Sequence, residues 1–429
     1  MDYTFTKSEQ FLERALQSIP LGSQTFSKSL TQYPHGISPF FMQRAKGART
    51  WDIDGNEYVD MINGLAAVTL GHCDPDVTAA VKEQIESGVI FSLPHPLETE
   101  VAEMIIDMIP CAEKVRYGKN GSDATAGAVR VARGFTRRDY IALCGYHGWQ
   151  DWYIGSTTRN LGVPKSTREM SLTFKYNDIK SLHQLFKEYP DKIAAVIMEP
   201  MGFEEPKDQF LHKVKELAHQ NGALFILDET ITGFRLSNGG AQQLYDIMPD
   251  MATFGKGLGN GYPISVVAGR SDIMKLMEEV FFSFTFGGEC LSLAAAKAVM
   301  TKIKTKDTIA ATQKQGVMLM GEVKALVKKH GLENVFAWGG HPCWQIMMVR
   351  DTPDFKSWEI KTLVMQELFQ RGVLMIGTNN MSYSHGNEEL AMVIRAYDET
   401  YGIVAEALKS KSILSKLRCK PLEPLFKIR

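Results

Sequence analysis

The pattern of apolar and polar residues predicts strands and helices in alternation along the middle of the chain. From about residue 98, short apolar segments alternate with segments in which apolar residues recur every three or four positions. The predicted strands are 114–118, 140–145, 193–200, 223–229, 251–255 and 264–269, and the predicted helices around them are 97–109, 123–136 and 209–222. This alternation is typical of βαβ units, which build a mostly parallel sheet covered by helices on both faces.

The two ends of the chain have a different pattern. Residues 1–20 read as an amphipathic helix, and residues 49–61 alternate around Asp54 and Gly55, which predicts a β-hairpin. After about residue 305, long helical segments alternate with two short strands. The helices are expected at 308–331, 357–372 and 387–410, and the strands at 342–350 and 373–377. We therefore predict an α/β domain followed by a smaller α+β domain.

Composition and charge exclude several classes of protein. The chain has 429 residues, is 44% hydrophobic and carries a net charge of −1, so it has no general bias toward nucleic acid or acidic membranes. No apolar run approaches the ~20 residues of a membrane span. The first 20 residues lack the pattern of a signal peptide, and the six cysteines lie far apart without a C-x-x-C pair. These features predict a cytoplasmic protein without a disulfide framework or a metal site.

The carboxyl ends of the predicted strands are where a parallel sheet gathers its ligands. Gly121 and Ser122 follow the strand 114–118 and directly precede a helix. Free N–H groups at a helix N-terminus attract anions, so this loop could bind a phosphate. The alternative is that Ser122 only caps the helix. The loop has no Walker P-loop pattern.

An aromatic cluster follows the strand 140–145. Tyr146 and His147 lie there beside two glycines. Aromatic rings at a strand end can stack on a flat ligand, but they can equally pack in the core.

Carboxylates follow two further strands. Glu199 ends the strand 193–200, and Asp228 ends the apolar run "ALFIL" in the stretch "DETITGFR". A buried carboxylate needs a partner. The pair could serve as glycosidase-like acids or as metal ligands, or one acid could face a cationic atom of a bound ligand.

Lys256 lies between two glycines in "GKGLGNGYP", after the strand 251–255. A lysine in such a pocket can be desolvated, which favours its neutral, nucleophilic form. The alternative is an ordinary surface lysine. The glycines do not form a dinucleotide-binding fingerprint, because Asn260 occupies the sixth position and a strand follows.

One cofactor accounts for four of these five loops. Pyridoxal 5′-phosphate (PLP) has an aldehyde for a lysine, a ring nitrogen for an acid, a phosphate for an anion-binding loop and a flat ring for stacking. The loops offer these groups as Lys256, Asp228, Gly121 with Ser122, and Tyr146. Asp228 could then be buried because it meets a protonated ring nitrogen.

The sequence resembles the class III (subgroup II) aminotransferases of PLP fold type I, and within them the glutamate-1-semialdehyde 2,1-aminomutase-like proteins. The likeness covers nearly the whole chain and includes "RAKGARTWDIDGNEYVDM", "KNGSDATAGAVRVAR", "DETITGFR", "FGKGLGNGYPI" and "FTFGGECLSLAAA". It implies a large domain with a mostly parallel seven-stranded sheet, residues 66–305, and a smaller domain built from residues 306–429 together with residues 1–65.

The resemblance also implies roles for individual residues. Lys256 would form the Schiff base and move protons, Asp228 would keep the ring nitrogen protonated, and Tyr146 would stack on the ring. The further cofactor-binding residues implied are Gly121, Ser122, His147, Glu199, Thr230 and Thr285. Thr285 would reach the phosphate of a second subunit, which implies a homodimer. Position 230 is usually valine in this family, so Thr230 adds a hydroxyl beneath the ring.

Other departures from the family concern the substrate. The nearest cation to the expected carboxylate-binding arginine is Lys28, Leu65 replaces an aromatic residue, and Asn379 and Asn380 replace a glutamate region. They favour an aminotransferase that moves an amino group from an amino donor to a keto or aldehyde acceptor, such as a sugar-like or secondary-metabolite precursor. Lys28, Glu199 and Asn380 are the predicted substrate-binding residues. The alternatives are an intramolecular 2,1-aminomutase and a binding module that keeps the fold without catalysis.

Overall fold

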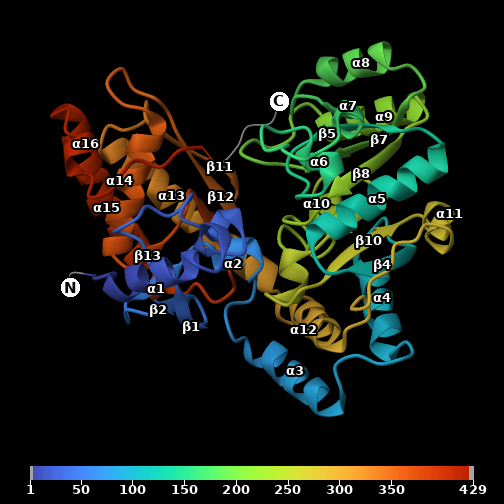
Figure 1. Cartoon of the computed structure of the whole chain (residues 1–429), viewed down its shortest axis with the longest axis horizontal. Helices are drawn as coiled ribbons and strands as arrows, with labels where there is room; N and C mark the ends of the chain where they lie inside the picture. Colours follow the sequence, from blue (N-terminus) through green and yellow to red (C-terminus); the bar gives the residue numbers. More distant parts are fainter. Residues whose placement is uncertain (1–2, 425–429) are drawn as a thin grey trace. The chain divides into compact units, whose positions relative to one another are not determined.

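The computed structural model describes residues 3–424, and these form two compact units (Figure 1). Among the described residues, the first unit combines residues 3–74 with residues 310–424. The second unit runs from Pro75 to Ile309. The sequence placed the corresponding divisions at 65/66 and 305/306.

A seven-stranded sheet forms the centre of the second unit. Its strands lie in the order β4-β10-β9-β8-β7-β5-β6. Their bounds are β4 Lys114–Gly118, β5 Tyr140–Cys144, β6 Ser171–Thr173, β7 Ile193–Met198, β8 Leu224–Asp228, β9 Met251–Phe254 and β10 Ser265–Gly269. All neighbouring pairs are parallel except those of β10, which runs antiparallel to both β4 and β9. The predicted seven-stranded, mostly parallel sheet is thus confirmed.

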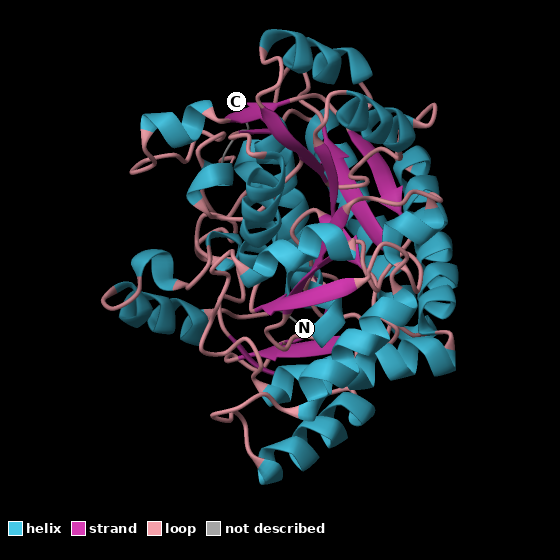
Figure 2. Ribbon diagram, turned by 90° about the vertical axis from the view of Figure 1, so that its right-hand side faces the viewer, coloured by secondary structure: helices cyan, strands magenta, loops and turns pink. Residues whose placement is uncertain are grey.

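The central strands are apolar because helices cover the sheet. All six residues of β7 and all five of β8 are buried, as expected for strands covered on both faces. Helix α5 (Gly121–Thr136) crosses several of the strands, and α9 (Phe210–Gln220) packs on β7 and β8. Figure 2 shows helices around the strands. This packing fixes where each strand ends, and therefore where its following loop begins.

The first unit contains two smaller sheets and three long helices. The sheets have the orders β1-β2-β3-β13 and β11-β12-β14. Their strands are β1 Met42–Lys46, β2 Arg49–Asp52, β3 Glu57–Asp60, β11 Phe336–His341, β12 Trp344–Val349, β13 Val373–Leu374 and β14 Thr378–Asn380. The long helices are α13 Thr308–Lys329, α14 Ser357–Gln370 and α15 Asn387–Lys409. The predicted hairpin around Gly55 is confirmed as the antiparallel pair β2–β3.

Some predicted elements have different bounds. The N-terminal helix is shorter than 1–20 and spans only Thr6–Leu16 as α1. Strand 373–377 is reduced to Val373–Leu374, which pairs in parallel with β3. Helix α5 begins at Gly121, two residues before the predicted start. No helix within residues 3–424 combines the length and the apolarity that a bilayer crossing requires.

Candidate functional site

The predicted site residues follow four strands that are neighbours in the sheet. Strands β9, β8, β7 and β5 lie side by side and run parallel. Their ends are followed by Lys256, Asp228 (the last residue of β8), Glu199 and the pair Tyr146 and His147. Because parallel strands end at one edge of the sheet, these side chains belong to one site. The sequence predicted the residues but not this strand order.

Asp228 is buried and accepts four hydrogen bonds. Its Oδ1 accepts from Thr230 Oγ1 at 2.6 Å, from Thr253 Oγ1 at 3.0 Å and from Thr230 N at 3.1 Å. Its Oδ2 lies 2.7 Å from His147 Nδ1, which must donate because a carboxylate oxygen only accepts. The side chain is held in one orientation by all four bonds.

These bonds keep Asp228 ionised in spite of its burial. Burial is the largest influence and would by itself raise the pKa of Asp228. The hydrogen bond and charge of His147, together with the hydrogen bonds from Thr230, lower the pKa below its usual value. Asp228 is therefore a fixed, buried anion that is suited to a cationic ligand atom.

His147 connects the aromatic loop to Asp228. Its ring is buried, and Nε2 lies 3.2 Å from the carbonyl oxygen of Cys144 at the end of β5. Tyr146 is 48% exposed, and its ring meets Tyr153 edge-on at 5.4 Å between centroids. The exposed ring of Tyr146 remains available for stacking, whereas His147 is a buried support of the acid.

Helix α5 is capped by Asn120 and Asp123 and not by Ser122. Asn120 is the N-cap: its side chain accepts from Asp123 N at 3.2 Å, and Asp123 accepts in return from Asn120 N at 3.0 Å. Ser122 does not cap the helix, so the simple alternative for this serine is wrong. Its hydroxyl accepts instead from Trp149 N at 3.2 Å.

A glycine allows the aromatic loop to lie against Ser122. Gly148 has φ +102°, and a Cβ at this position would overlap the Ser122 hydroxyl. The two loops therefore touch only because this residue has no side chain. The close contact holds the Ser122 side chain at the N-terminus of α5, where backbone N–H groups attract anions.

Lys256 has the properties of a nucleophilic amine. Its backbone lies in the left-handed region with φ +40°, which is uncommon for a residue with a side chain and is often found at functional sites. Burial is the largest influence on the amine and lowers the pKa of Lys256, although Glu199 and Asp228 act in the opposite direction. Within residues 3–424, Lys256 has no ion-pair partner. A larger fraction of the amine is therefore neutral than in a solvated lysine.

Glu199 is a partly buried acid with a strongly shifted pKa. Burial and then the charge of Asp228 raise its pKa from 4.5 to about 7, against the lowering effects of His147 and Lys256. Its Oε2 accepts from Tyr146 N at 2.8 Å, which holds the aromatic loop to the end of β7. A carboxyl group that titrates near neutral pH is suited to exchange a proton at this edge of the sheet.

Replacement of Glu199 by Gln should change how the stability of the cofactor-free protein depends on pH. Because folding raises this pKa, ionisation of Glu199 disfavours the folded state. The resulting loss of folding free energy is absent below pH 4.5, grows as pH rises to about 7, and is constant above. The variant should therefore gain about 3 kcal/mol over wild type at pH 8 relative to the difference at pH 4.5. Denaturant unfolding at both pH values measures this gain. A difference independent of pH would contradict it.

Glu229, the second acid of "DETITGFR", supports the fold. It is fully buried and accepts from Thr232 Oγ1, from the backbone N–H groups of Ala241 and Gln242, and from the Gln242 side chain. These bonds tie the end of β8 to α10 (Gly240–Leu244). The two adjacent acids thus differ. Asp228 Oδ2 accepts one hydrogen bond and has room for a further donor, whereas each oxygen of Glu229 already accepts two.

Sequence reasoning missed Thr253 and Tyr153. Thr253 is the β9 residue paired with Asp228 in the sheet, so the register places its hydroxyl beside the carboxylate. Its signal in the sequence was a polar residue within an apolar strand. Tyr153 is buried against both Tyr146 and His147 and completes the aromatic cluster.

The remaining predicted residues belong to other elements than these strand ends. Thr285 is exposed in the loop before α12 (Cys290–Lys306) of the second unit. Lys28 and Asn380 belong to the first unit, where Lys28 is exposed and Asn380 is buried. The Asn380 amide nitrogen donates to Ile62 O at 2.8 Å. The contact of Thr285 with a cofactor phosphate and the contacts of Lys28 and Asn380 with substrate stay predictions.

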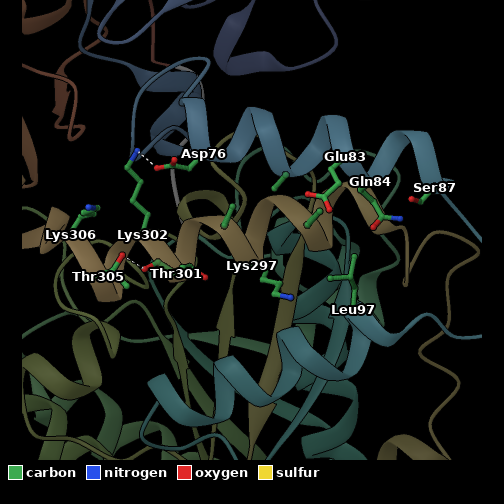
Figure 3. A pocket seen from close by; sticks show the side chains of 13 residues that line it. Asp76, Glu83, Gln84, Ser87, Leu97, Lys297, Thr301, Lys302, Thr305 and Lys306 are labelled. Atoms are coloured by element: carbon green, nitrogen blue, oxygen red, sulfur yellow. Dashed lines mark hydrogen bonds and ion pairs between the residues drawn. The ribbon is translucent and has the colours of Figure 1, made fainter.

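A groove of about 550 Å³ lies elsewhere on the second unit, between α3 (Pro75–Ser87) and α12. Figure 3 shows its charged lining, which includes the ion pair of Lys302 with Asp76 at 2.7 Å. None of the site residues described above lines this groove. In the described part of the chain, no group of three or more His, Cys, Asp or Glu residues is placed to hold a metal ion.

Comparison with known proteins gives a family. The model of the "Aminotransferase class-III" family matches residues 32–384. Glutamate-1-semialdehyde 2,1-aminomutase of Aquifex aeolicus is 33% identical over 393 residues, which cover 86% of this chain and 92% of the relative. Glutamate-1-semialdehyde 2,1-aminomutase 1 of Lachnoclostridium phytofermentans is 35% identical over 346 residues, which cover 76% of this chain and 81% of the relative.

Solved structures share the fold over nearly the whole chain. The FumI protein of Sphingopyxis sp. MTA144, in its PLP internal aldimine form, superimposes with a TM-score of 0.88 at 26% identity and covers 97% of this chain and 99% of its own. An omega-transaminase of Sphaerobacter thermophilus gives a TM-score of 0.83 at 24% identity over 92% of this chain and 97% of its own. At this low identity, the second structure supports the fold alone.

Proposed function

The chain belongs to the class-III aminotransferases, and from that premise we propose that it is a PLP-dependent enzyme that moves an amino group from an amino donor to a keto or aldehyde acceptor. One observation carries the proposal: four neighbouring parallel strands end in a partly buried lysine, a buried ionised aspartate, a glutamate of raised pKa and an aromatic pair. A glycosidase or metal site would need only the carboxylates, and would leave Lys256 and the anion-binding loop without a role.

The residues present fit PLP. Asp228 offers a buried anion for the ring nitrogen, and Ser122 with the first N–H groups of α5 offers donors for the phosphate. Tyr146 presents an exposed ring for stacking, and Lys256 presents an amine for the aldehyde. When bound, PLP supplies an electron sink that stabilises negative charge next to the amino nitrogen of a substrate.

Lys256 and Glu199 would handle the protons. The desolvated amine of Lys256 can take a proton from a bound substrate and return it to a different atom, as general base and then general acid. Glu199 has a pKa raised to about 7 and follows β7, which is separated from β9 by β8. From there its charge acts on Lys256. Together they would keep a proton available at the site without admitting bulk water.

The substrate class is proposed from positions at which this sequence departs from the family pattern. A lysine at position 28, in place of the expected arginine, lacks the fork that binds a carboxylate with two hydrogen bonds. We therefore propose a polar acceptor, such as a sugar-like or secondary-metabolite carbonyl compound, with Lys28, Glu199 and Asn380 as substrate-binding residues. The second candidate is a 2,1-aminomutase, because two relatives at 33% and 35% identity carry that name.

A half-reaction distinguishes the two candidates. The purified enzyme with PLP is mixed with single amino donors, and the visible spectrum and the released keto acid are measured together. An aminotransferase should release one equivalent of keto acid per active site and then consume an acceptor. Conversion of an added amino aldehyde to its isomer, without net release of a carbonyl product from any donor, would instead establish the aminomutase.

We further propose a homodimer and a cytoplasmic location. Two segments with exposed apolar side chains meet in the second unit, where Cys290 N donates to Val89 O at 2.8 Å. The segment of Val89 includes Leu93 (80% exposed), and the segment before Cys290 includes Phe281 (85%) and Phe286 (57%). A monomer rarely leaves so much apolar surface exposed. Thr285 lies within the second segment, where a second subunit could receive it. Light scattering tests the dimer. The six cysteines form no disulfide within residues 3–424, which supports a reducing compartment.

A further inference from the structure

The two oxygens of Asp228 have unequal surroundings. Oδ1 accepts three hydrogen bonds, from Thr230 Oγ1, Thr230 N and Thr253 Oγ1, whereas Oδ2 accepts one, from His147. A carboxylate oxygen offers about two lone-pair sites. Oδ1 is therefore saturated, and Oδ2 is the oxygen with room for a further donor.

Packing fixes the direction of the Thr230 hydroxyl. A Cβ placed on Gly121 would lie 2.8 Å from Thr230 Cγ2, and a Cβ placed on Gly255 would lie 3.4 Å from it. The methyl group of Thr230 thus lies between the anion-binding loop and the residue before Lys256. With the methyl group held there, the hydroxyl points to Asp228 Oδ1 and makes the shortest of the four hydrogen bonds, 2.6 Å.

The Thr230 hydroxyl affects how strongly the Asp228 carboxylate accepts a proton more than it affects the orientation of that carboxylate. A hydrogen bond to an ionised carboxylate stabilises the anion and reduces its attraction for a further proton. If the hydroxyl were absent, the bonds from Thr230 N, Thr253 and His147 would still hold the carboxylate in place. The acid would keep its position but would accept more strongly.

We propose that Thr230 is a positioning residue whose hydroxyl donates the shortest of the three hydrogen bonds to Asp228 Oδ1 and thereby weakens the hold of Asp228 on the ring N–H of PLP. The proposal rests on the PLP binding proposed above. It sets Thr230 apart from a residue that only packs beneath the ring, because packing alone does not depend on the ring nitrogen.

The test compares two cofactors on the cofactor-free protein. Wild type, Thr230→Val and Thr230→Ser are each titrated with PLP and with its deaza analogue, in which a C–H group replaces the ring nitrogen, and both dissociation constants are measured. The ratio of the two constants reports only the interaction with the ring nitrogen. Valine removes the hydroxyl and keeps the shape, whereas serine keeps the hydroxyl and removes the methyl group.

Thr230→Val should increase the preference for PLP over the deaza analogue about three- to tenfold. Thr230→Ser should keep the wild-type ratio while both affinities fall. Thr232→Val is the matched control, since it removes a buried hydroxyl that donates to Glu229 instead, and its ratio should equal that of wild type.

Two results would overturn the proposal. An unchanged ratio in Thr230→Val would mean that Thr230 only packs against the glycines, and a decreased ratio would mean that its hydroxyl strengthens the acid. Failure of wild-type protein to bind PLP would give a different result, with no ratio to compare, and would overturn the proposed function itself.

Discussion

Replacing Lys256 with alanine should abolish amino transfer, with turnover falling at least about 10⁴-fold. The variant loses the only group at this edge of the sheet that can both bind the cofactor aldehyde covalently and carry a proton between substrate atoms. The fold should persist, because the Lys256 amine forms no ion pair within residues 3–424. Single-turnover rates with an amino donor measure the loss, and far-ultraviolet circular dichroism checks the fold.

A chemical experiment separates this role from a general effect of removing a lysine. Borohydride reduction of the wild-type enzyme with PLP, followed by mass mapping of peptides, should place a pyridoxyl group on Lys256. The Lys256→Ala variant should show no modified peptide, and the exposed helix variant Lys213→Ala should react like wild type. Turnover of Lys256→Ala within tenfold of wild type would show that another residue moves the proton.

Replacing Asp228 with Asn should reduce turnover about 10³-fold and weaken the retention of PLP. The amide keeps the size of the side chain but has no negative charge to hold a protonated ring nitrogen. It also turns an N–H group toward donors, either His147 Nδ1 on one side or the two threonine hydroxyls on the other. Steady-state rates and the dissociation constant of PLP measure the two effects.

Glu229→Gln is the matched control for Asp228→Asn. Glu229 is the adjacent buried acid, but each of its oxygens already accepts two hydrogen bonds. The amide of glutamine would face one of these donors, so the variant should lose about 1–3 kcal/mol of stability while it binds PLP as tightly as wild type. If both variants changed stability alone, Asp228 would be a structural acid and not a cofactor ligand.

The pH dependence of cofactor uptake follows from the same cluster. Burial lowers the pKa of Lys256, and the charges of Glu199 and Asp228 raise it in part. Asp228→Asn removes one of these charges, so covalent uptake of PLP should extend to lower pH in this variant. The protonation of Lys256 thus depends on the charge of Asp228, since both residues lie at the same edge of the sheet.

The sequence by itself determined the elements and most of the chemistry. The strands β4, β5, β7, β8, β9 and β10 and the helices α5 and α9 were predicted to within a few residues, because hydrophobic periodicity is a local property. Since ligand-binding loops follow such strands, Lys256, Asp228 and Glu199 could be found before any pairing was known. The helices α3, α8 (Ile179–Glu188) and α12 were not predicted.

Only the tertiary structure decided how these residues work together. Strand order depends on contacts between distant parts of the chain, and it places β10 antiparallel between β4 and β9 and brings Thr253 opposite Asp228. The cap of α5 proved to be Asn120, the residue before the first helical position, and the Ser122 hydroxyl instead accepts from Trp149 N in a loop that Gly148 lets approach. The sequence thus supplied the acid, the amine and the anion-binding loop. Packing and register decided which oxygen of that acid has room for a further donor, because those contacts join residues that no local pattern connects.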